Sequence, residues 1–117
     1  MAEYNERDAL GAYLTRHLTS LMTDFERRCY RLGVMREKAE ASPDSRVAER
    51  LRAEWQEADQ EVREALADGV GALRERIVER VQRERGALSV NRCPRCDRIA
   101  RTPLAKQCFW CGHDWHG

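Results

Sequence analysis

Two Cys-x-x-Cys motifs near the C-terminal end, Cys93/Cys96 and Cys108/Cys111, constrain this chain more than any other feature. Only eleven residues separate them. A Cys-x-x-Cys turn places two thiolates at the spacing of one edge of a tetrahedron, and Zn²⁺ favours four such ligands. The sequence therefore predicts one structural Zn²⁺ held by these four cysteines. Because four thiolates leave no ligand position open for water, the site is expected to be structural and not catalytic.

Three other interpretations of the cysteines stay open at this point. A redox pair would need one motif on a thioredoxin-like strand–helix unit, which the pattern lacks. An iron site of the rubredoxin type shares the two turns, but usually with a longer intervening segment. His113 or His116 could replace one ligand or bind a second metal. The fifth cysteine, Cys29, falls on an apolar helical stripe and is expected in the core.

The residue that follows each Cys-x-x-Cys turn often needs a left-handed backbone. Gly112 occupies this position after the second pair and Asp97 after the first. Glycine adopts the conformation freely, and aspartate tolerates it better than most residues.

Upstream of the cysteines, apolar residues recur at helical spacing over two long stretches, 5–40 and 42–86. Asn5 or Asp8 is expected to cap the first helix, while Ser42 would cap the second with Pro43 as its first residue. Gly69 and Gly71 weaken the second helix, and the sequence does not decide whether it breaks there. The apolar positions that we expect in the helical seam are Leu14, Leu18, Leu21, Phe25, Leu51, Trp55, Val62 and Leu66.

These elements predict a mainly α fold: a long antiparallel, coiled-coil-like helical hairpin over residues 1–88 and a small four-cysteine zinc ribbon over residues 89–117. Gly86 is expected to end the second helix. The apolar sector of the first helix is wider than one seam needs. A second copy of the chain would cover the rest in a homodimer, or a partner protein would do so.

Composition narrows the choice of partners. Charged residues make up 35% of the chain, against about 25% on average, as suits long solvated helices. The net charge is only +1, so bulk charge indicates neither nucleic acid nor a membrane. The N-terminal residues contain no apolar stretch of signal-peptide type, and no run of about 18 apolar residues occurs. We therefore expect a cytoplasmic protein with reduced thiols.

We find no nucleophile–base constellation, no phosphate-binding glycine loop and no paired carboxylates that would suit an enzyme or a small-molecule substrate. The expected function is that of a non-enzymatic interaction module, an adaptor or accessory subunit. The alternative is a nucleic-acid-binding or RNA-polymerase-binding factor linked to transcription. Its contacts, or those to a protein partner, would come from Arg95, Arg98, Arg101 and Trp110.

The tail is similar to the zinc-ribbon superfamily, in which a Cys-Pro-x-Cys turn pairs with a Cys-x-x-Cys-Gly turn. It also resembles the tails of small uncharacterised bacterial helix-plus-ribbon proteins, through Thr102, Pro103, Ala105, Gln107, Cys108, Cys111, Asp114 and Trp115. This resemblance covers about 25 residues and implies a fold, not an activity.

The whole layout is similar in architecture to the DksA/TraR regulators of RNA polymerase, whose acidic hairpin tip, Asp-x-x-Asp-x-Ala, enters the secondary channel of the polymerase. At the corresponding tip this chain has Asp44 and Ala48, but only one of the two aspartates, and Arg46 brings the opposite charge. The segment between the two cysteine pairs is also shorter than in that family.

Overall fold

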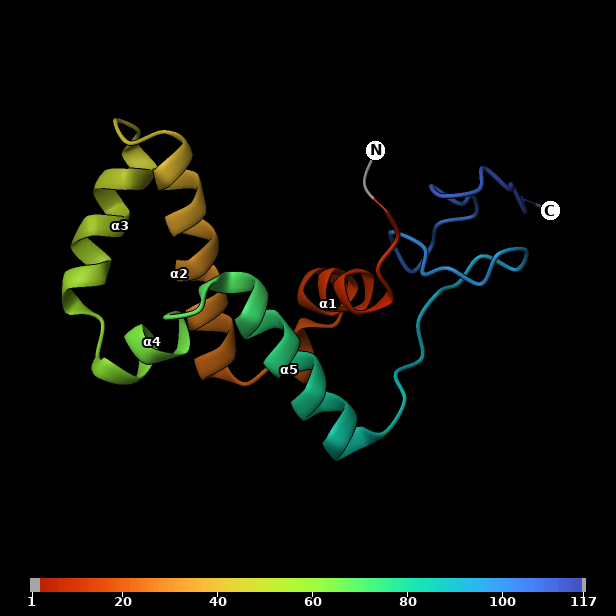
Figure 1. Cartoon of the computed structure of the whole chain (residues 1–117), viewed down its shortest axis with the longest axis horizontal. Helices are drawn as coiled ribbons and strands as arrows, with labels where there is room; N and C mark the ends of the chain where they lie inside the picture. The colour runs from red at the N-terminus through yellow and green to blue at the C-terminus, as the bar shows by residue number, and fades with distance from the viewer. Residues whose placement is uncertain (1–2, 117) are drawn as a thin grey trace. The chain divides into compact units, whose positions relative to one another are not determined.

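The structure is a computed structural model that describes residues 3–116. These residues are mainly helical and contain no strand (Figure 1), which confirms the predicted fold class. The helices are α1 (Glu6–His17), the 3₁₀ helix η1 (Thr19–Leu21), α2 (Asp24–Ala41), α3 (Arg46–Glu57), α4 (Gln60–Ala65) and α5 (Gly69–Arg85). Across the described chain, no helix combines the length and the apolar character that a membrane span requires.

Two compact units divide the chain. The N/C unit combines the residues up to Leu21 with those from Ile77 onward, and the hairpin unit runs from Met22 to Arg76. The N/C unit therefore holds α1, the end of α5 and the cysteine-rich tail. The N/C unit thus joins the tail with the first helix, whereas the predicted division placed residues 1–88 in one domain and residues 89–117 in another. That residues 89–117 form a domain of their own stays a prediction.

The first predicted helix, over residues 5–40, is interrupted between α1 and α2. Asn5 caps α1 as expected, because its side chain accepts a hydrogen bond from the Asp8 N–H at 3.0 Å. Thr23 then starts α2 with a capping box: its hydroxyl accepts from the Glu26 N–H, and the Glu26 carboxylate accepts from the Thr23 N–H. The cap satisfies two backbone donors that a continuous helix would satisfy internally, and so makes the break favourable.

α2 and α3 form an antiparallel hairpin within the hairpin unit (Figure 1). Its turn differs from the predicted one. Ser42 ends α2, because its N–H donates to the Lys38 carbonyl, and Pro43 lies in the turn. Ser45 caps α3 instead, with its hydroxyl accepting from the Ala48 N–H at 3.2 Å. Ser42 and Ser45 have the same hydroxyl group, and either can cap a helix. The sequence alone therefore placed the start of α3 three residues too early.

The second predicted helix, over residues 42–86, is also interrupted. Asp59 caps α4 by accepting a hydrogen bond from the Val62 N–H at 3.1 Å, which separates α3 from α4. A turn then follows Ala65, and α5 starts at Gly69, so the second break lies just before the glycines. As predicted, the last helix ends before Gly86.

Half of the eight predicted seam residues are buried within the chain itself. Leu14, Val62 and Leu66 are fully buried, and Leu51 is nearly so. Leu18 and Leu21 are half-buried. The eight positions do not form one seam, however: Leu14, Leu18 and Leu21 belong to the N/C unit and the other five belong to the hairpin unit.

Two aromatic seam residues remain accessible. Phe25 is 42% exposed on α2, so within this chain it lies outside the core, contrary to its predicted place. Trp55 is half-buried, and the guanidinium groups of Arg36 and Arg63 lie 5.5 and 5.8 Å from its ring centroid. Arg63 also donates to the Trp55 carbonyl near the end of α3, where a cation complements the helix dipole.

Gly33 lets α2 approach the residues around the start of α5 closely. A Cβ at this position would lie 2.9 Å from Leu66 Cδ2 and 3.0 Å from Val70 Cγ2. Both neighbours are buried and have little room to move. Gly71, by contrast, has no atom within 4 Å of a would-be Cβ.

Alanine at these two glycines should therefore change stability in opposite directions. Gly71→Ala should raise the free energy of unfolding by about 0.5–1 kcal/mol, because alanine favours the helix. Gly33→Ala should lower it by about 1 kcal/mol, because overpacking against Leu66 and Val70 outweighs the same helical gain. Urea denaturation followed by circular dichroism measures both. A stabilised Gly33→Ala variant would contradict the close approach.

Candidate metal centre

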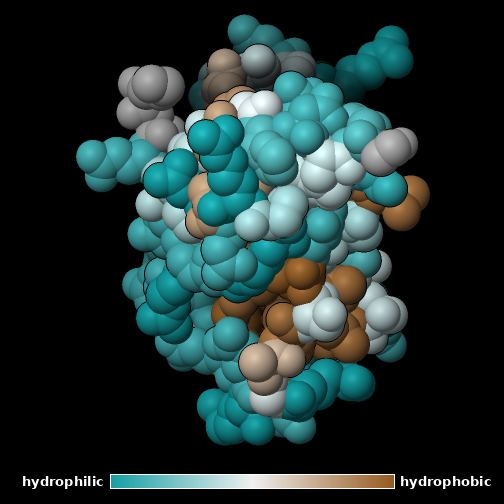
Figure 2. All heavy atoms as spheres, turned by 90° about the vertical axis from the view of Figure 1, so that its right-hand side faces the viewer, coloured by the Kyte–Doolittle hydropathy of each residue, from teal (hydrophilic) through white to brown (hydrophobic). Residues whose placement is uncertain are grey.

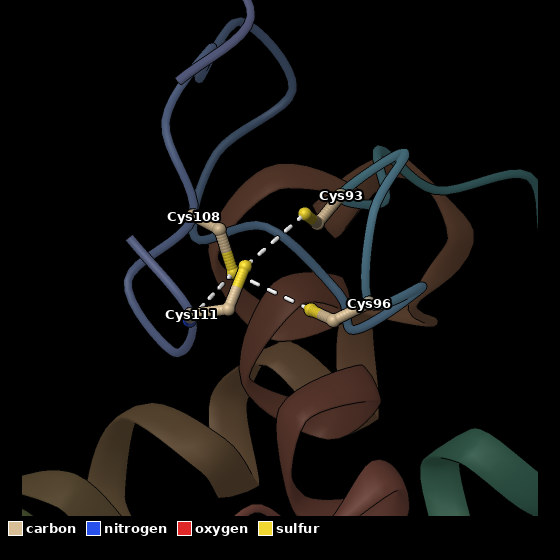
Figure 3. Close-up of side chains that lie close together, drawn as sticks. All are labelled: Cys93, Cys96, Cys108 and Cys111. Atoms are coloured by element: carbon tan, nitrogen blue, oxygen red, sulfur yellow. Dashed lines mark hydrogen bonds between the residues drawn. The ribbon is translucent and has the colours of Figure 1, made fainter. Parts of the chain in front are cut away.

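The four predicted cysteines converge on one point. Their sulfur atoms all lie within 4.8 Å of one another, and they point towards one another from two loops (Figure 3). The Cys93–Cys111 and Cys96–Cys108 sulfur pairs are each 3.7 Å apart. A disulfide would need about 2.05 Å, whereas the edge of a tetrahedron with metal–sulfur bonds of about 2.3 Å is about 3.8 Å. The cluster could therefore hold a metal ion.

The two Cys-x-x-Cys loops have the same backbone hydrogen bonding. In the first loop the Cys93 N–H donates to the Arg98 carbonyl, and the Asp97 N–H donates to the Cys93 carbonyl. The second loop repeats both bonds, from Cys108 to His113 and from Gly112 to Cys108. Isolated bridges, Arg92 with Ile99 and Gln107 with Asp114, close the two loops.

Both loops turn through the left-handed backbone that the sequence predicted. The φ angles of Asp97 and Gly112 are 63° and 77°. Asp97 is the only non-glycine residue with positive φ among the described residues. This conformation reverses the chain directly after each cysteine pair and aims both sulfurs of the pair at the same point.

Backbone amides also stabilise the sulfurs as thiolates. The Arg95 N–H donates to the Cys93 sulfur at 3.4 Å, and the Trp110 N–H donates to the Cys108 sulfur at 3.3 Å. Burial opposes the ionisation of Cys108, but the Cys111 and Trp110 amides outweigh it and lower the pKa of this thiol to about 7. Thiolate is the form that binds a metal, so this environment favours binding.

Cys96, the neighbour of Cys108 in the cluster, behaves in the opposite way. The Arg98 amide lowers its pKa, but burial and the adjacent sulfurs outweigh that amide and raise the pKa to about 11. The two thiols thus differ in how readily they ionise. An ion bound by all four sulfurs as thiolates has to displace their protons.

Neither histidine of the tail belongs to the cluster, which within residues 3–116 consists of the four cysteines alone. His113 stacks on Trp115 at a centroid distance of 6.0 Å. The ring of His116 pairs with Asp114 at 2.5 Å, and this interaction helps to lower the pKa of the Asp114 carboxyl. Cys29 is fully buried on α2, as predicted for a core residue.

The loops of the tail are tied to α1 and the segment before it. The hydroxyl of Tyr4 accepts a hydrogen bond from the Ile99 N–H at 3.1 Å, and that of Tyr13 accepts from the Asn91 N–H at 3.3 Å. Asn91 in turn donates from its side chain to the Thr102 and Ala105 carbonyls. Two tyrosines from the start of the chain thus hold the backbone on either side of the first cysteine loop.

An ion pair strengthens the same junction. Arg92 donates to the Glu6 carboxylate at 2.6 Å and to the Asp97 carbonyl at 2.9 Å. The hydrogen bond from Arg92 lowers the pKa of Glu6. Tyr4 also donates to Glu6, and burial followed by this bond raises the pKa of the tyrosine.

The four residues proposed for partner contacts fall into two groups. Arg95 and Arg101 are exposed, and Arg101 lies 3.6 Å from the ring centroid of Phe109. Arg98 and Trp110 are half-buried and pack on each other, with the guanidinium 5.8 Å from the Trp110 centroid. Tyr4 completes this packing, because it meets Trp110 edge-on and also contacts Arg98.

Sequence reasoning missed this junction. Tyr4 precedes the first predicted helix, and Tyr13 lies within it. The available signal was that both are tyrosines, whose hydroxyls seek a hydrogen-bond partner when the ring is buried. Nothing in the spacing of the residues indicates that their partners lie beside Cys93.

Comparison of the chain with models of protein families, with curated proteins and with solved structures finds no significant match in any of the three.

Proposed function

We propose that the chain is a non-enzymatic interaction module, an adaptor or accessory subunit, whose tail is a zinc ribbon built around one structural Zn²⁺. The observation that carries the proposal is the closed set of four sulfurs. Such a set completes the coordination of the ion and leaves no position for a water or a substrate. The ion then stabilises a surface and takes no part in chemistry.

Zinc suits the cluster because it favours tetrahedral thiolate coordination and has no redox chemistry of its own. The 3.7 Å sulfur separations match the tetrahedral edge expected for zinc–sulfur bonds. Iron in a rubredoxin-type site is the main competitor, and metal analysis distinguishes the two.

Exposed apolar side chains support an interaction function. The face of the molecule drawn in Figure 2 is mainly hydrophilic, with one area where apolar side chains gather. Among the described residues, the large apolar side chains that stay exposed are Phe25 at 42%, Phe109 at 58% and Leu104 at 88%. Leu104 and Phe109 both belong to the tail, so the tail offers more exposed apolar contact than the helices do.

The helical seam offers less surface to a partner than the sequence suggested, because its leucines and valines are largely buried within the chain. A homodimer would thus have to use the residues that remain accessible, Phe25 foremost. We retain the homodimer as a proposal, alongside a heterologous protein partner.

The metal content is the first test of the proposal. The purified chain should carry about one zinc per chain, measured by elemental analysis. Cys108→Ser should lose the ion and unfold the tail, because structural zinc supplies roughly 10–16 kcal/mol to small metal-binding domains. The α2–α3 hairpin should keep its circular dichroism. Cys29→Ala, which changes the cysteine outside the cluster, should retain the zinc. Iron in place of zinc, or no metal, would contradict the proposal.

Association is the second test. Phe25→Asp and Leu104→Asp alter exposed side chains and should leave the fold intact, but they should weaken self-association or partner binding. Light scattering and chemical cross-linking of the purified and lysate-incubated chain measure this.

The salt dependence of binding distinguishes the interaction module from the nucleic-acid-binding alternative. Protein association through apolar contacts and one or two ion pairs should weaken only modestly between about 50 and 200 mM salt, whereas nucleic-acid binding through several arginine–phosphate contacts should weaken steeply. If Arg95→Ala with Arg98→Ala abolishes binding and the two aspartate variants bind normally, the nucleic-acid alternative replaces the interaction module.

A further inference from the structure

A hollow of about 160 Å³ lies between α1 and the tail, entirely within the N/C unit. Ala9 and Ala12 line it from α1, and Ile99 and Ala100 line it from the tail. These small or apolar residues leave room that larger side chains would fill. An engineered apolar cavity of about 150 Å³ in another protein accepts benzene, so this volume suits one side chain of leucine or phenylalanine size.

Two cations stand beside this apolar hollow. Arg16 comes from the last turn of α1 and Arg101 from the tail, and both line the hollow. Neither has a carboxylate within ion-pair distance in the described part of the chain. Arg101 lies over Phe109 instead, 3.6 Å from its centroid. The hollow therefore combines an apolar interior with two positive charges that have no anionic partner among residues 3–116.

A second, more open hollow lies in the tail. It has a volume of about 420 Å³ and shares Arg101 and Phe109 with the first, and it is also lined by Ala105 and Gln107. The two hollows thus flank the same Arg101–Phe109 pair.

We infer that the hollow between α1 and the tail is a docking site for an acidic peptide segment of a partner protein, which inserts one apolar side chain between Ala12 and Ile99 and places carboxylates on Arg16 and Arg101. The inference rests on the proposed function and names the partner chemistry for it. The apolar insertion supplies binding energy, and the paired charges fix the orientation and select acidic sequences.

The same residues fit a peptide better than a nucleic acid. Single-stranded nucleic acids need open aromatic faces and a basic groove that follows the backbone. Here Arg98 lies over the rings of Tyr4 and Trp110, and Arg101 lies over that of Phe109. Two cations also match one or two carboxylates more closely than a chain of phosphates.

The test is a selection of peptides from a displayed library of random linear sequences, using the full zinc-loaded chain as bait. Selected peptides are then synthesised, and their Kd is measured by fluorescence anisotropy. We expect sequences with Asp or Glu on either side of one Leu, Ile, Met or Phe. Arg16→Glu should weaken their binding at least tenfold, and Ala12→Leu, which fills the hollow, should do the same.

Arg50→Glu is the matched control, because it makes the same charge change on an exposed residue of α3 in the other unit. It should leave Kd unchanged, and zinc content and circular dichroism check that all variants fold. Peptides without acidic residues, or peptides that bind Arg16→Glu and Ala12→Leu normally, would overturn the inference and leave the interaction module standing. If no peptide is recovered and a single-stranded RNA oligonucleotide binds in a way that depends on Arg16, the peptide docking site and the interaction module are both overturned.

Discussion

Residues 89–116 have almost no apolar core. The fold of the tail therefore depends on some other interaction that holds its loops together. The buried apolar residues there are Cys93, Ile99, Ala100 and Cys108, two of which are members of the sulfur cluster. A segment of this size cannot offset the entropy of ordering its loops by hydrophobic burial alone. The convergence of four sulfurs at one point offers a replacement, because an ion bound there would join the two loops as a core does.

The helix at the start of the chain supplies a second constraint on the same loops. Tyr4 and Tyr13 accept hydrogen bonds from backbone N–H groups on both sides of Cys93. Since these groups are fixed relative to α1, the first loop has an anchor that does not depend on the metal. Metal binding and the packing of α1 should therefore stabilise each other, as expected when two constraints order the same backbone.

The sequence predicts the site better than the helices because the two rest on interactions of different range. The cysteine spacing and the left-handed residues Asp97 and Gly112 are local, and in the structure the four sulfurs converge and both residues have positive φ. The helical spacing of apolar residues correctly indicates helices. It does not reveal where one helix ends and the next begins, because the same spacing can continue through the residues between them. The breaks depend on caps, Thr23 with Glu26 and then Asp59, whose side chains offer the backbone an alternative partner. Both caps are readable in the sequence; the contacts of Tyr4 and Tyr13 are not.

Because the predicted seam residues are largely buried in the chain itself, they have little apolar surface left with which to bind a partner. A side chain that is already buried in its own chain gains nothing further from a partner, so Leu14, Val62 and Leu66 stabilise the fold and not an interface. The tail has the opposite balance: its core is minimal, Leu104 and Phe109 remain exposed, and a cation, Arg101, stacks on the Phe109 ring. A cation held on an aromatic surface keeps its charge available to an anion while its apolar stem covers the ring. A partner that docked on such a surface would be selected through charge and apolar contact together.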